Sequence, residues 1–158
     1  MTFYLLLKTL HVIGATVLFG TGAGIAFFML MAHRSGDARV IAHTAAVVVI
    51  ADTLFTATAV VLQPITGAWL AHIAGFPVLH GWVALSLILY VVTGLFWLPV
   101  VWMQIRMRDL ALAAVRDGAA LPPQYHRLWK LWVALGFPAF FAVAAILWLM
   151  VAKPNIPL

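Results

Sequence analysis

The chain alternates between long apolar segments and short polar turns. The apolar segments cover about residues 3–32, 40–70, 81–105 and 131–152. Each is long enough to cross the hydrocarbon core of a bilayer, which takes about 20 residues of α-helix. Helices are expected for all four, because irregular backbone cannot face lipid. We therefore predict an all-α fold, a single integral membrane domain over residues 1–158 in which the helices form an antiparallel four-helix bundle.

The turns between the segments are short, with one exception. Residues 106–125 are expected to form the only sizeable loop. Inside it, residues 109–116 are predicted to form a short helix on the membrane surface, stopped by Gly118 and by the pair Pro122 and Pro123. The second apolar segment is longer than a bilayer is thick, so its ends must tilt or project.

The composition narrows the class of protein further. Hydrophobic residues make up 66% of the chain and charged residues 8%, so a soluble domain of this kind would expose large apolar patches. A lipid bilayer is therefore the expected partner. The net charge is +5, but the basic residues lie in the turns and form no basic face, so nucleic acid is not expected. The chain has no cysteine, which leaves histidine, methionine and carboxylate as its metal ligands.

The cations are distributed unevenly between the two ends of the predicted bundle. Seven lie in or beside the first and third turns, whereas only Lys8 and Lys153 lie at the other end. Lysine and arginine favour the cytoplasmic side of a membrane, so both termini should lie on the outer side. The first apolar segment is too long for a signal peptide and is expected to remain as a helix.

Polar side chains at membrane depth gather in the outer half of the predicted bundle. Lys8 and His11 lie three residues apart and share a helix face. The polar residues of the second segment form one stripe, expected to face the bundle interior: Asp52, Thr56, Gln63 and Thr66. Tyr90 of the third segment reaches the depth of Gln63 and His11. The pattern predicts a polar pocket with His11 at its centre.

A structural interpretation of these groups stays open beside the functional one. Lys8 can extend to the membrane surface, His11 can bind a backbone carbonyl and Asp52 can pair with a threonine. Against this, imidazole at membrane depth is costly unless it is neutral, and neutral imidazole is the usual ligand of haem iron and other metals. An ionisable group inside a membrane therefore marks a candidate site by default.

Other features of the sequence are expected to be structural. Gly20 and Gly24 are spaced for a close helix contact. Five tryptophans near predicted helix ends are expected to anchor the helices at the membrane interfaces: Trp69, Trp82, Trp129, Trp132 and Trp148. Four methionines toward the inner side are expected to pack in the core: Met29, Met31, Met103 and Met107.

Several motifs resemble known bacterial membrane families. Residues 8–14 (KTLHVIG), with residues 31–33 (MAH) at the end of the same segment, resemble the first helix of HemJ-type protoporphyrinogen oxidases and of CopD-like copper-resistance proteins. Residues 66–70 (TGAWL) are similar to the end of the second HemJ helix, and residues 125–130 (YHRLWK) and 151–154 (VAKP) to its last helix. End to end, the chain resembles an uncharacterised bacterial membrane family, catalogued as a domain of unknown function.

The resemblance implies a role in redox chemistry. It implies that His11 ligates or orients a b-type haem or tetrapyrrole, with Lys8 as partner of a propionate, Gln63 and Tyr90 beside the cofactor, and a quinone as electron partner in a bacterial inner (cytoplasmic) membrane. If the protein is an enzyme, it is expected to be an oxidoreductase related to protoporphyrinogen oxidase. HemJ-type proteins usually have a lysine directly after a Leu-His pair at the start of the third helix. Here Leu79 and His80 are followed by Gly81, so this lysine is missing.

Other classes of function remain compatible with the same residues. One is a small transporter or a CopD-like metal-handling module that uses Asp52, Gln63 and the outer histidines, His72 and His80. Another is a structural accessory subunit in a homo-oligomer or membrane complex. A haem spectrum would separate the redox protein from both alternatives.

Overall fold

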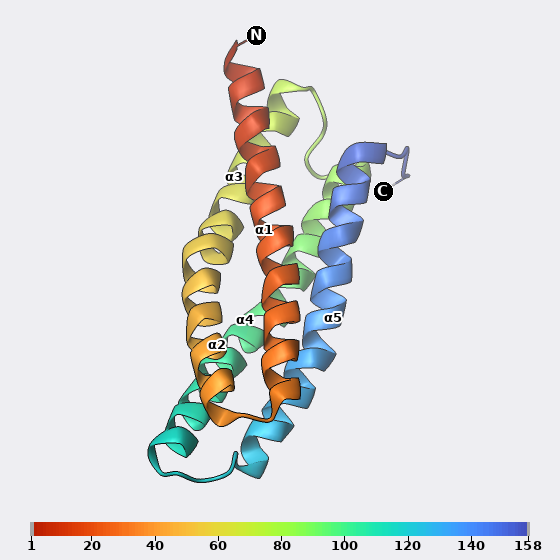
Figure 1. Ribbon diagram of the computed structural model, residues 1–158. Coiled ribbons are helices and arrows are strands. Elements are labelled where there is room, and N and C mark those ends of the chain that lie inside the picture. The colour runs from red at the N-terminus through yellow and green to blue at the C-terminus, as the bar shows by residue number, and fades with distance from the viewer. Residues whose placement is uncertain (1, 158) are drawn as a thin grey trace.

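The computed structural model describes residues 2–157 as four helical rods (Figure 1). In chain order the elements are α1 (Thr2–Ser35), α2 (Ala38–Ala51), η1 (Asp52–Thr56), α3 (Ala57–Ile73), α4 (Gly81–Arg116) and α5 (Pro123–Ala152). The second rod is continuous, because η1 is a π-helical turn between α2 and α3. All four rods are long and apolar enough to cross a membrane, and residues 2–157 contain no strand. The prediction of an all-α four-helix membrane fold is confirmed.

Tight turns reverse the chain between neighbouring rods. Gly36 takes a positive φ of 66°, which is unstrained only for glycine, and the side chain of Asp37 then caps α2 by accepting from the Arg39 N–H at 2.8 Å. Gly118 ends α4 in the same conformation, with φ of 62°. Consequently the rods run antiparallel and both chain ends lie at one end of the bundle (Figure 1).

The loop expected at residues 106–125 is largely helical. α4 continues to Arg116 and α5 begins at Pro123, so the connection is only residues 117–122, and residues 109–116 are the last part of α4 and not a separate surface helix. The charged residues from Arg106 onward indicate that the chain leaves the membrane here, but they do not end the helix. Its helix-forming residues present an apolar face that packs in the core: Met107, Ala111 and Ala114.

The apolar core lies toward the arginine-rich end of the bundle, called the inner end after the orientation that the charges predict. The buried face of the first part of α5 has helical spacing: Tyr125, Leu128, Trp129 and Trp132. Trp129 and Trp132 are therefore core residues, and their prediction as interfacial anchors is wrong. Met29, Met103 and Met107 are buried in the same core as expected, whereas Met31 is exposed.

The outer half of the bundle is built from two helix pairs. There α3 packs on α1, and α4 packs on α5. Phe19 of α1 stacks on Phe140 of α5 with ring centroids 4.8 Å apart, which joins the two pairs. The close contact predicted at Gly20 and Gly24 does not form within residues 2–157, since no atom of another helix would meet a Cβ at either position.

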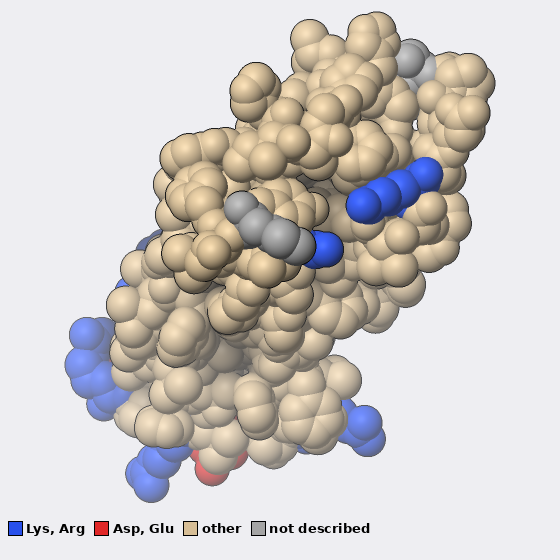
Figure 2. Space-filling model, turned by 90° about the horizontal axis from the view of Figure 1, so that it is seen from above, with Lys and Arg blue, Asp and Glu red and all other residues tan. Residues whose placement is uncertain are grey.

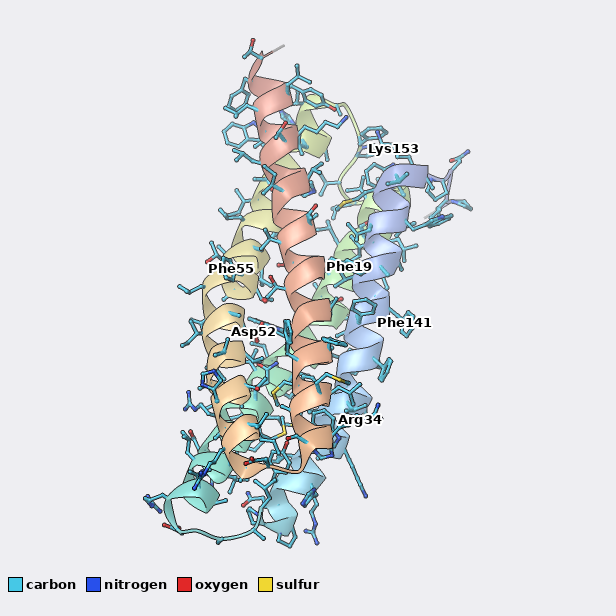
Figure 3. The ribbon with its side chains drawn as sticks, in the orientation of Figure 1. Phe19, Arg34, Asp52, Phe55, Phe141 and Lys153 are labelled. Carbon is cyan, nitrogen blue, oxygen red and sulfur yellow. The ribbon has the colours of Figure 1, made fainter. Side chains whose placement is uncertain are left out.

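The outer surface of the rods suits lipid. Phe55 and Phe141 point away from the bundle (Figure 3), and both side chains are exposed. Figure 2, which looks onto the end that carries the two chain termini, shows a mostly tan surface, with several of the Lys and Arg side chains at its lower margin. The apolar exterior and the uneven charge agree with a protein whose helices cross a membrane.

Candidate functional site

The His11 ring is held against α3 by the Thr66 hydroxyl. His11 Nδ1 lies 2.7 Å from Thr66 Oγ1. The same oxygen lies 2.8 Å from the Leu62 carbonyl and 3.3 Å from the Gln63 carbonyl of its own helix. Because the hydroxyl hydrogen points to one of these carbonyls, the oxygen accepts from the His11 N–H. We assign the tautomer protonated at Nδ1, which leaves the Nε2 lone pair without a hydrogen-bond partner among residues 2–157.

Gln63 binds the backbone at the same level. Its Nε2 donates to the His11 carbonyl at 3.0 Å, and this bond is buried. Two glycines make the approach possible: a Cβ at Gly14 would collide with the Gln63 amide, and a Cβ at Gly67 would lie 3.2 Å from His11 Cε1. α1 and α3 therefore meet through two polar side chains, and each packs against a glycine of the opposite helix: His11 against Gly67, and Gln63 against Gly14.

Lys8 and Tyr90 lie close to this contact without joining it. Lys8 is exposed, and its Nζ lies 6.0 Å from the centre of the Tyr4 ring. The Tyr90 hydroxyl donates to the Val60 carbonyl, which ties α4 to α3 about one turn from Gln63. The structure thus brings His11 together with Gln63 and Thr66, while Lys8 lies one turn nearer the N-terminus and Tyr90 reaches α3 from α4 at Val60.

Asp52 forms a second polar centre, at the π-helical turn. Asp52 is only 4% exposed, and its Oδ1 accepts from the Trp97 indole N–H of α4 at 3.4 Å. Its Oδ2 and the Thr56 hydroxyl are both buried without a hydrogen-bond partner in residues 2–157. Asp52 therefore faces the bundle interior and not lipid. Single π-helical turns interrupt the regular hydrogen-bond pattern of an α-helix, and they are frequent at functional sites.

A third cluster, at the inner end, was not anticipated from the sequence. The His33 ring stacks on Trp129 with centroids 4.1 Å apart, and its Nδ1 lies 3.3 Å from the Tyr125 hydroxyl. His33, His126 and Asp37 line a hollow of about 510 Å³. These residues lie far apart in the sequence, and no spacing rule connects the end of α1 to the start of α5.

The charged residues outside the spans behave as surface groups. The Arg116 guanidinium beside Asp117 holds the pKa of that carboxyl below its usual value, but both side chains are exposed. Among residues 2–157, no three His, Cys, Asp or Glu side chains are grouped so that they could hold a metal ion.

Comparison with known proteins places the chain in a family. No curated protein and no solved structure matches it, so the resemblance to HemJ-type and CopD-like proteins rests on the short motifs alone. Residues 5–154 match a family described as predicted integral membrane proteins (DUF2269). Because this match covers nearly the whole chain and the structure has four helices able to cross a membrane, the protein belongs to that family of integral membrane proteins.

Proposed function

We propose that this multi-pass membrane protein is a haem-binding redox protein of the bacterial inner membrane, with His11 as the axial ligand. The observation that carries the proposal is the bond between His11 Nδ1 and the Thr66 hydroxyl. Histidine ligands of metals almost always donate the hydrogen of their other ring nitrogen to a fixed acceptor, which sets the tautomer and the ring orientation. Thr66 gives His11 this arrangement.

The residues around His11 fit the chemistry of such a group. The residue is 8% exposed and its Nε2 has no hydrogen-bond partner in residues 2–157, so the ligand atom would be neutral and oriented. Gln63 fixes the α1 backbone at the same residue. Lys8, one turn nearer the outer end and exposed, is placed to pair with a propionate.

A haem held at this position would supply one-electron transfer, with a quinone as the proposed electron partner. What the chain itself provides is orientation and an apolar environment. His11 presents one nitrogen, Thr66 holds the other, and the surrounding residues of α1 and α3 are mostly apolar. Tyr90 ties α4 to α3 near the same level and would limit the movement of the two helix pairs. The same site would serve an electron carrier or a protoporphyrinogen oxidase-like enzyme that takes a tetrapyrrole.

One observation favours a structural role instead. His11 and Gln63 lie over Gly67 and Gly14, which is also how two helices would be fastened together. In that case the protein is an accessory subunit of a membrane complex or homo-oligomer, and His11 serves only to pack α1 on α3.

Absorption spectroscopy separates the two roles. The protein, purified from haem-replete cells, should show a Soret band and an α band that sharpens on reduction. His11→Ala should lose these bands while keeping its helical content, and added imidazole should restore them. His72→Ala, which removes an exposed histidine of α3, should keep the parent spectrum. A colourless parent protein, or an unchanged spectrum in His11→Ala, would refute the proposal.

A further inference from the structure

Asp52 is the one acidic residue of the sequence that does not lie near the inner end of the bundle. The sequence has four Asp and Glu residues, and the other three lie at the turns or at the inner end of α4: Asp37, Asp109 and Asp117. Asp52 instead lies within the second rod, on the side that faces α1 (Figure 3). At 1.5 Å per residue it is about 20 Å from the start of α2, well inside the membrane-spanning length.

The carboxyl has hydrogen-bonding groups around it but no charged partner. Within residues 2–157, Trp97 makes the one hydrogen bond to the carboxyl, and the Thr56 hydroxyl four residues later has no hydrogen-bond partner. The elements that pack against η1 are α1, α2 and α3, and Trp97 brings α4 to the same point. These helices carry titratable groups above and below the level of Asp52, and none of the following interacts with it: His11 and His33 on α1, His43 on α2, His72 on α3, Tyr90 and Arg106 on α4.

An ionised carboxylate would be unstable in these surroundings. Moving a lone charge into a medium of low dielectric constant costs several kcal/mol even after relaxation, whereas a neutral carboxyl avoids most of that cost. The ion pairs in residues 2–157 join Arg108 to Asp109 and Arg116 to Asp117, both outside this region. A proton is thus the simplest charge that can neutralise Asp52.

The unpaired atoms indicate where the proton would lie. Oδ1 already accepts from the Trp97 indole, so it is the carbonyl-type oxygen. Oδ2 is buried and free, and the Thr56 hydroxyl, one π-helical turn later on the same rod, is buried and free as well. A hydrogen on Oδ2 that is donated to the Thr56 oxygen would give each of these two atoms a hydrogen-bond partner.

We infer that Asp52 and Thr56 form a proton-binding site inside the membrane. Asp52 holds a proton near neutral pH, on Oδ2 and directed to the Thr56 oxygen. The inference does not depend on a haem at His11, because it rests on the burial and the partners of Asp52 alone. Acidic residues at membrane depth commonly mark ion or proton pathways.

Carbodiimide labelling of the full-length protein in lipid nanodiscs tests this inference. Dicyclohexylcarbodiimide is hydrophobic and reacts with carboxyl groups that carry a proton. Near neutral pH it should modify Asp52, and peptide mapping by mass spectrometry should place the label there. Asp52→Asn should lose the label, whereas Asp109→Asn, which removes an acid paired with Arg108, should be labelled like the parent. Absence of label from Asp52 in the parent protein overturns the inference, whether or not the Asp52→Asn variant folds.

A second arm separates a proton from a small cation. Labelling is repeated in sodium chloride and in choline chloride of the same concentration. For a proton site the rate should be equal in the two salts and should fall as the pH rises. Protection by sodium at constant pH would show that Asp52 and Thr56 bind a metal cation, and would overturn the assignment of a proton site.

Discussion

Replacing Thr66 by valine tests the hydrogen bond on which the proposed site depends. Valine keeps the branched shape of threonine and replaces the hydroxyl by a methyl group. The hydroxyl accepts from His11 Nδ1 at 2.7 Å and bonds back to its own helix. The substitution therefore removes one contact between α1 and α3 and frees the His11 ring to rotate or change tautomer, with almost no change in packing volume.

Two magnitudes follow from this geometry. Hydrogen bonds between membrane helices contribute on average about 0.6 kcal/mol and at most about 1.7 kcal/mol, so the bundle should remain folded. Loss of the group that orients a metal-binding histidine lowers cofactor affinity by about 10-fold to 100-fold. That range corresponds to about 1.4 to 2.8 kcal/mol of binding free energy. The effect on haem affinity should exceed the effect on stability.

Thr58→Val is the matched control. Thr58 is an exposed residue of the same helix whose hydroxyl bonds back to the Leu54 carbonyl at 2.6 Å, as Thr66 bonds back to Leu62. Haem is titrated into each apoprotein in detergent, and the Soret absorbance gives the dissociation constant. Thr58→Val should bind like the parent and Thr66→Val at least about tenfold more weakly. Equal affinities in the two variants would refute the role assigned to Thr66.

Two further predictions concern the fold and its orientation. Met107→Ala should lower the free energy of unfolding by about 2–5 kcal/mol, because Met107 is fully buried. Leu98→Ala, at an exposed position that faces lipid, should change it little. Unfolding in mixed micelles, followed by circular dichroism, measures both free energies. An alkaline phosphatase fusion after Lys153 should be active and a fusion at Gly118 inactive, because seven of the nine cations lie at the end that carries Gly118. The reverse activities would invert the topology.

The sequence by itself determined the four helices and the face that one of them turns inward. A run of apolar residues this long must satisfy its own backbone hydrogen bonds in lipid, so the helices follow from composition and length. The stripe of polar residues on the second rod follows from helical periodicity, and Asp52, Thr56 and Gln63 are indeed all buried. His11 stood out because histidine is rare at membrane depth.

The sequence was less informative where a helix leaves the membrane. The charges from Arg106 onward predict where the third segment leaves the membrane, but α4 continues to Arg116. Charge reports contact with water or lipid headgroups, whereas continuation of a helix depends on propensity and on an apolar face such as that of Met107 and Ala111. The prediction that Trp129 is an interfacial anchor was wrong because an aromatic residue near a helix end can pack in the core as well as at the interface.

Only the tertiary structure decided which residues meet. Periodicity gives the face of a helix but not its neighbour, so the bonds from His11 to Thr66 and from Gln63 to the His11 carbonyl could not be read from spacing. The π-helical turn at Asp52 is equally hidden, because Asp52 stands out by its charge and nothing in residues 52–56 marks a change in the backbone hydrogen-bond pattern. Partners at a helix contact are set by how closely two backbones approach, and here glycines on both helices, Gly14 and Gly67, fix that distance.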